Sequence, residues 1–301
     1  MKEQSAARSD RISWRNQLIN PVLNKEFKLR MRTPRAMWTL FSYLFAIGLL
    51  ALSAIYLSEV TSGRGQSFNP EQSKILFYFM SMAQLGLIAF MAPGLTSGVI
   101  SGEREKQTLN LLLTTQQSSA TIILSKLVSS LSFMVLIVIS TIPVYSMIFL
   151  YGGISPKQLF LVFLFYLFIM FVLGAFGISF STLFKRTMIS VIVTYGLTLF
   201  LFGGTALFYI VLIGVVEQLP VSTTNSYGWI GHVIAWNPAA ALYSILDPSI
   251  SDQAFSVNTS RQSMNNAPLA LWQEFVIVYS LLSILALWLG IRRLRPRIKR
   301  K

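Results

Sequence analysis

Cysteine is absent from this chain of 301 residues, and histidine occurs once, at His232. The missing cysteine excludes a disulfide framework, a thiolate metal site and a cysteine nucleophile. A single histidine, which we expect to be structural, cannot supply the clustered His, Asp or Glu residues that an intramembrane protease or lipid phosphatase needs. The sequence therefore predicts no catalytic residue and no metal site in this chain.

Charge is scarce as well. Charged residues make up 12% of the chain, about half the share in an average soluble domain, whereas hydrophobic residues make up 53%. The hydrophobic residues form blocks of about 20 residues or more, long enough to cross a bilayer as helices. Weak alternation at a period of two disfavours a β-barrel. The predicted fold class is an all-α integral membrane protein, one domain over 37–291 with six spans at 37–57, 75–100, 122–151, 159–184, 188–216 and 269–291.

Basic residues are placed unevenly along the chain. Lysines and arginines in short loops stay on the cytoplasmic side of a membrane. With a cytoplasmic N-terminus, that side holds all 25 of them except Arg64, Lys74, Lys157 and Arg261. We therefore expect both termini inside, in a multi-pass protein of a bacterial cell membrane. This topology explains the net charge of +14, so nucleic acid is not an expected partner, whereas lipid headgroups are expected to contact the basic cytoplasmic tail at 292–301.

Two segments outside the spans have helix signals of their own. Residues 1–36 read as a cytoplasmic lead with an interfacial elbow helix that begins at Asn20-Pro21, although a solvated basic segment remains the alternative. The outer loop at 217–268 is too long for a simple connector. Within it Asn237-Pro238 is typical of a helix start, so we expect a partly helical loop that packs against the membrane domain.

Two further absences limit how this chain could use energy. No ionisable residue is expected at mid-depth in a span, where a proton- or sodium-coupled carrier would need one. We expect Lys126, Lys185 and the acids near span ends to reach the interface instead. No Gly-Lys dipeptide occurs, so the chain lacks a P-loop for a nucleotide's phosphates. Transport driven by this chain alone is therefore disfavoured, and no cofactor is expected in it.

A polar island, residues 101–115 (SGEREKQTLNLLLTT), separates the second and third spans. As a helix it is amphipathic, because Leu109, Leu112 and Leu113 fall at positions i, i+3 and i+4. Charged residues crowd its first turn. We predict a helix at the membrane surface that offers its polar end to a partner, over a segment at 101–118. In the alternative, the acids only stabilise the helix N-terminus.

The wording of this island resembles the GERE-type coupling segment of type-2 ABC exporter permeases, through Gly102-Glu103-Arg104-Glu105 and the later lysine Lys126. Residues 20–26 (NPVLNKE) resemble the elbow helix of the same class. The resemblance implies a permease driven by separate ATPase subunits, which would bind ATP and magnesium, and paired with a second permease copy or paralogue. It assigns partner coupling to Gly102, Glu103, Arg104, Glu105, Leu109, Leu112 and Leu113.

Movement of the spans and passage of a substrate would need residues outside the polar island. Pro93-Gly94 and Pro143 interrupt helix hydrogen bonding within spans and are candidate hinges. The polar side chains that could line a path are Gln84, Tyr145, Thr194, Tyr195 and Thr198. Two rival functions remain: a membrane scaffold that docks a partner without transport, and an intramembrane enzyme, which the missing chemistry disfavours.

Overall fold

The computed structural model describes residues 33–62, 70–109, 118–150, 152–216, 218, 228–255 and 269–294. In this part of the chain the regular elements are all helical. Six helical stretches are long and apolar enough to cross a membrane: Met37–Leu57, Glu71–Glu105, Ser119–Leu150, Pro156–Leu183, Thr187–Val216 and Leu271–Leu294. The predicted all-α, six-span fold is confirmed. Of the predicted lead and elbow helix at 1–36, residues 1–32 lie outside the described residues, and 34–36 belong to the helix of the first span. Of the predicted tail at 292–301, residues 295–301 lie outside them, and 292–294 still belong to the last span.

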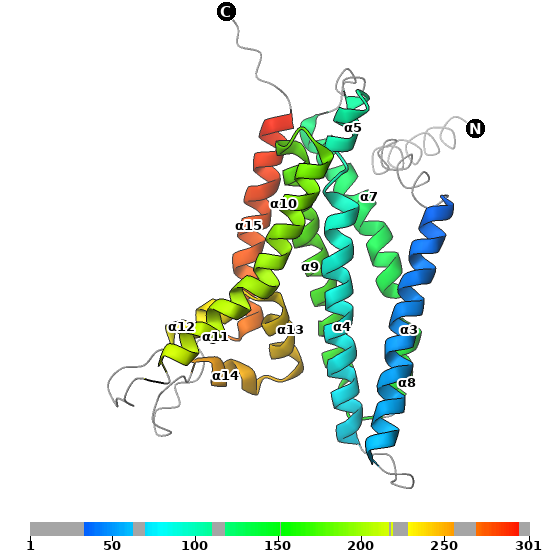
Figure 1. Cartoon of the computed structure of the whole chain (residues 1–301), viewed down its shortest axis with the longest axis vertical. Coiled ribbons are helices and arrows are strands. Elements are labelled where there is room, and N and C mark those ends of the chain that lie inside the picture. Colours follow the sequence, from blue (N-terminus) through cyan, green and yellow to red (C-terminus); the bar gives the residue numbers. More distant parts are fainter. Residues whose placement is uncertain are drawn as a thin grey trace, which may run out of the picture.

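Two helices form the centre of the bundle (Figure 1). They are α4 (Pro70–Thr96) and α9 (Pro156–Leu183), which pack on each other and on α15 (Leu271–Leu294) or α3 (Pro34–Ser62) at the sides. Aromatic rings fill much of the core, and the rings of Phe275 and Tyr279 stack with centroids 4.3 Å apart. The buried hydroxyls of Tyr145, Tyr166 and Tyr279 donate to backbone carbonyls, as Tyr166 does to that of Ser81 at 2.9 Å, whereas the Tyr43 hydroxyl has no partner among the described residues. These bonds compensate for burying hydroxyl groups in an apolar core.

Three of the six stretches are interrupted helices. In the second, a turn at 97–100 follows α4. The third consists of α7 (Ser119–Ile139) and α8 (Ile142–Leu150), which separate just before Pro143. The fifth consists of α10 (Thr187–Leu199), a π-helical turn η1 (Phe200–Gly204) and α11 (Thr205–Val216). In Figure 1, α10 runs beside α4, whereas α11 leans away from it.

Three short helices cover the end of the bundle to which α11 leads (Figure 1). They are α12 (Trp229–Ala235), α13 (Pro238–Leu246) and α14 (Ser249–Phe255). We call them the outer layer, after the outer loop that the sequence predicts here. Asn237 is the N-cap of α13 and Pro238 is its first residue, as the sequence predicts. The carbonyl of Leu246, at the end of α13, accepts hydrogen bonds from the Tyr78 hydroxyl and the Gln158 amide. The outer layer is thereby tied to both central helices.

The opposite end of the bundle carries the short helix α5 (Ser101–Glu105). The start of α3 and the end of α15 lie at this same end in Figure 1. An even number of spans requires this arrangement, and a cytoplasmic location of the two termini stays a prediction. The polar island therefore lies at the end of the molecule farthest from the outer layer.

Candidate functional site

The polar island begins as an extension of the second span. After α4 the backbone continues through a turn into α5, with the Gly102 amide bonded to the Gly98 carbonyl and the Arg104 amide to that of Ile100. The helix then ends at Glu105, and Gln107 takes a left-handed backbone conformation with φ of 59°. The prediction of one continuous helix from Ser101 onward is therefore wrong, because a helix cannot pass through a residue in this conformation.

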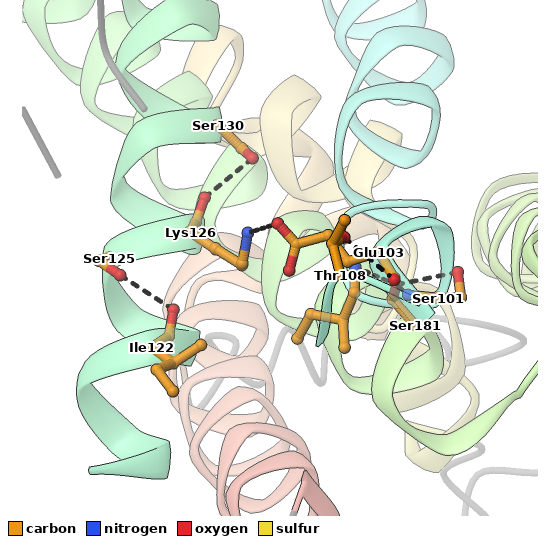
Figure 2. Close-up of polar contacts among 9 residues, drawn as sticks. Ser101, Glu103, Thr108, Ile122, Ser125, Lys126, Ser130 and Ser181 are labelled. Atoms are coloured by element: carbon orange, nitrogen blue, oxygen red, sulfur yellow. Dashed lines mark hydrogen bonds and ion pairs between the residues drawn. The ribbon is translucent and has the colours of Figure 1, made fainter. Parts of the chain in front are cut away.

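A serine from the fourth span holds the start of α5. The Ser181 hydroxyl oxygen, buried in α9, accepts hydrogen bonds from the Ile100 amide at 2.8 Å and the Ser101 amide at 2.9 Å. The Ser101 hydroxyl lies 3.2 Å from it as well (Figure 2). First-turn amides of a helix lack partners within the helix. Ser181, 80 residues later in the sequence than Ser101, supplies the missing acceptor.

Glu103 forms an ion pair with Lys126 in the third span. Its Oε1 lies 2.5 Å from the lysine Nζ (Figure 2). Only 2% of the Lys126 side chain and 28% of the Glu103 side chain are exposed. Lys126 thus does not reach the interface as the sequence suggests, because its charge is balanced inside the bundle. Burying a charge is costly unless it is paired in this way.

Arg104 contacts the end of the fourth span. Its guanidinium donates to the carbonyl of Thr182 at 3.2 Å and to that of Phe184, the C-cap of α9, at 3.3 Å. Carbonyls at a helix C-terminus lack partners within the helix and carry partial negative charge. The positive charge of Arg104 therefore stabilises the end of α9.

Glu105 contacts the start of the fifth span. Its carboxylate accepts hydrogen bonds from the Thr187 amide at 2.7 Å and the Thr187 hydroxyl at 2.8 Å. Thr187 is the first residue of α10, so the carboxylate also faces the positive end of a helix dipole. Gly102 lies opposite the same threonine. The first turn of α10 is therefore held against α5.

Together the three charged residues link α5 to the third, fourth and fifth spans. Sequence analysis assigned them as polar contacts to a partner, whereas the structure gives each one an intramolecular partner. A role toward an ATPase stays a prediction. In the alternative, the acids only stabilise the helix N-terminus. Glu103 does lie in the first turn of α5, so this alternative stays open, and the contacts to three spans come in addition to it.

The apolar side of the island is only partly described. Leu109 is 5% exposed and belongs to a buried cluster with Ile100, Ile122 and Leu127. It lies on the inside, as its pattern predicts. Leu112 and Leu113 lie outside the described residues.

Among the described residues of the island, the exposed ones are Glu105 and the turn that comes after α5. Lys106, Gln107 and Thr108 are exposed, and we call these three residues the α5 turn. The Thr108 amide and hydroxyl both bond back to the Glu103 carbonyl, at 3.0 and 3.2 Å. Sequence analysis did not single out the turn, because nothing in a run of helix-forming residues predicts a left-handed Gln107.

The candidate hinges differ from each other. Pro143 coincides with the break between α7 and α8. Pro93, in contrast, lies inside α4, and the chain leaves regular helix only after Thr96. Gly94 faces the hydroxyl of Tyr195 in the fifth span. A hinge role for these residues stays a prediction.

Most of the candidate path residues are buried within this single chain. Gln84 and Tyr145 are 0% and 1% exposed and bond to Thr141 and to the Met80 carbonyl. Thr194 and Thr198 bond to carbonyls of their own helix. Tyr195 alone of the five is half-exposed, with its hydroxyl bonded to the Phe90 carbonyl. A path-lining role for these residues stays a prediction.

Comparisons with known proteins agree with this architecture. No curated protein matches the chain. The family model described as ABC-2 family transporter protein matches residues 20–293, which include the polar island and all six spans except the last residue of the sixth. The chain therefore belongs to the ABC-2 family, as a multi-pass permease subunit of an ABC transporter.

Proposed function

We propose that this permease subunit works in an exporter, with separate ATPase subunits that dock on the α5 turn and with a second permease copy or paralogue. The sequence supports a separate energy source, since it has no Gly-Lys dipeptide and hence no P-loop. ATP and magnesium would then be bound by the ATPase subunits.

The observation that carries the proposal is the combination of an exposed turn with a firmly attached helix. Lys106, Gln107 and Thr108 face outward, while Glu103, Arg104 and Glu105 tie the same short segment to three other spans. A force applied at the turn would reach those spans through charge-assisted hydrogen bonds, which are among the stronger polar contacts in proteins.

A membrane scaffold that docks the same partner without transport is the rival function. The attachments of α5 favour transport, because a scaffold needs an exposed surface but gains nothing from linking that surface to span ends. The two functions differ in the consequence of docking: only the transporter couples docking to substrate-dependent ATP hydrolysis.

The test must separate docking from internal packing. Reversing Glu103 or Glu105 would disturb both, so we choose Lys106→Glu combined with Gln107→Gly. Glycine tolerates the left-handed conformation at position 107. Lys157→Glu, at an exposed lysine in the first turn of α9 at the opposite end, is the matched control.

We expect the double variant to bind the co-expressed ATPase roughly tenfold more weakly or worse, because losing desolvated polar contacts costs about 1–3 kcal/mol. Pull-down of the ATPase and substrate-stimulated ATP hydrolysis measure the two steps, and thermal unfolding of the permease should stay unchanged. Normal association and stimulation in the double variant would contradict docking at the α5 turn. Association without any substrate-stimulated hydrolysis, in the unmodified protein, would favour the scaffold.

A further inference from the structure

The fifth span contains a π turn whose geometry is held from two sides. In η1 the Thr205 amide bonds to the Phe200 carbonyl, five residues earlier. The ring of Phe200 lies against Gly204, where an added Cβ would come within 2.7 Å of Phe200 Cδ2. A π turn takes up one residue more than an α-helical turn and is found often at functional sites.

Side chains bond to two carbonyls of this turn. The Thr205 hydroxyl donates to the Leu201 carbonyl at 2.6 Å. Asn237 is the N-cap of α13 in the outer layer. Its amide nitrogen donates to the Phe202 carbonyl at 2.7 Å and to the Thr205 hydroxyl oxygen at 3.0 Å. Asn237 is 2% exposed. Its contact is therefore made inside the protein, away from competing water.

The other half of the same amide group caps α13. Asn237 Oδ1 accepts hydrogen bonds from the Ala239 amide at 2.8 Å and from the Ala240 amide at 3.3 Å. Both hydrogens of the amide nitrogen and its oxygen are thus used. One side chain joins the start of α13 to the π turn, so the outer layer cannot move away from the span without breaking one of the two sets of bonds.

We propose that Asn237 is a positioning residue that locks the π turn and thereby sets the direction of α11 relative to α10. Without the lock, the span returns to continuous α-helix. Because an α-helix has 3.6 residues per turn, removing the extra residue from the turn rotates α11 by about 100° relative to α10. The lock lies near the middle of the span, between α10 and α11, and the start of α10 is held by Glu105. Because Asn237 bonds to both, the outer layer cannot move without a rotation of α11.

The critical variant separates the two tasks of Asn237. Serine is a good N-cap, so Asn237→Ser keeps the cap of α13, but its short hydroxyl does not reach the Phe202 carbonyl. Asn237→Ala loses both tasks. Thr205→Val leaves the cap untouched and removes one of the two groups to which the Asn237 nitrogen donates, together with the bond to Leu201.

The experiment measures spin-label distances in the full chain in lipid nanodiscs. The sequence has no cysteine, so two introduced cysteines are labelled without background. One pair joins Ile210 on α11 to Phe160 on α9, and the control pair joins Ile192 on α10 to the same Phe160; all three positions are more than 60% exposed.

For the first pair we expect a change of about 5 Å or more in Asn237→Ser and Asn237→Ala, since a helix with side chains is about 10 Å wide and turns by about 100°. Thr205→Val should give a smaller change in the same direction, and the control pair should not change. A purely capping role predicts an unaltered distance in Asn237→Ser, and that result would overturn the proposal. If Asn237→Ser does not fold, an unaltered distance in Thr205→Val overturns it equally.

Discussion

Different kinds of contact hold α5 and the outer layer, at the two ends of the molecule, against the spans. At the α5 end, the described residues make an ion pair between Glu103 and the buried Lys126, and charged side chains reach the ends of two more spans. At the outer-layer end, Glu274 forms a hydrogen bond with His232, which is 52% exposed, while buried contacts are made by neutral groups such as Asn237. Charged side chains thus hold the helices together at the α5 end, whereas at the outer-layer end they lie at the surface.

This difference fits the functions that the two ends would serve. Neutral hydrogen bonds in an apolar setting depend on close geometry and fix the outer layer in place. Charge-assisted bonds are stronger and act over somewhat longer distances, so they persist while a helix moves. The α5 end is therefore suited to transmitting a displacement, and the outer-layer end to holding a shape.

Removing Lys126 should have the largest effect. In Lys126→Met, Glu103 loses its cation, and its second oxygen already has no hydrogen-bond partner among the described residues. We expect a loss of about 2 kcal/mol or more in the free energy of unfolding. Thermal unfolding of the purified chain in detergent measures it.

The control for this prediction is the double variant Glu103→Met with Lys126→Met. Two apolar side chains of similar length should restore most of the lost stability, because a buried ion pair contributes little over a packed hydrophobic pair. A double variant less stable than Lys126→Met alone would show that the charges, rather than their balance, hold α5 in place.

An intermediate effect is expected where two neutral donors share one acceptor. Tyr78→Phe or Gln158→Met alone should cost about 0.5–1 kcal/mol, because the Leu246 carbonyl keeps its other donor. The double variant leaves that buried carbonyl without either and should cost more than the sum. A double-mutant cycle of unfolding free energies measures this excess. Strictly additive costs would contradict a shared acceptor.

The sequence predicts those features that local chemistry determines. Long apolar runs place the six spans, Asn237-Pro238 places the start of α13, and Pro143 places the break in the third span. Each signal lies within a few residues of its effect. The loss of one backbone donor at Pro143, for example, acts on the preceding turn whatever the rest of the fold does.

The attachments of the polar island could not be predicted, because they join residues far apart in the chain. Arg104 and Glu105 find their partners about 80 residues away, at the ends of α9 and α10. The π turn was missed for a related reason: Gly203-Gly204 suggests close packing, but Asn237 stabilises the turn from another segment. A lysine within an apolar run, such as Lys126, was the one available signal of a buried partner.

The smallest effect should come from the contact between His232 and Glu274 at the outer-layer end. His232 Nδ1 lies 2.8 Å from Glu274, and the imidazole also meets the Phe255 ring edge to face at 5.1 Å. Because half of the imidazole is exposed, solvent screens the pair, and such pairs contribute about 0–1 kcal/mol. We expect His232→Gln to lower the unfolding free energy by about 0.5 kcal/mol or less, measured in the same detergent and at the same pH as Lys126→Met. A loss as large as that of Lys126→Met would mean that charge holds both ends of the molecule, and the contrast between them would fail.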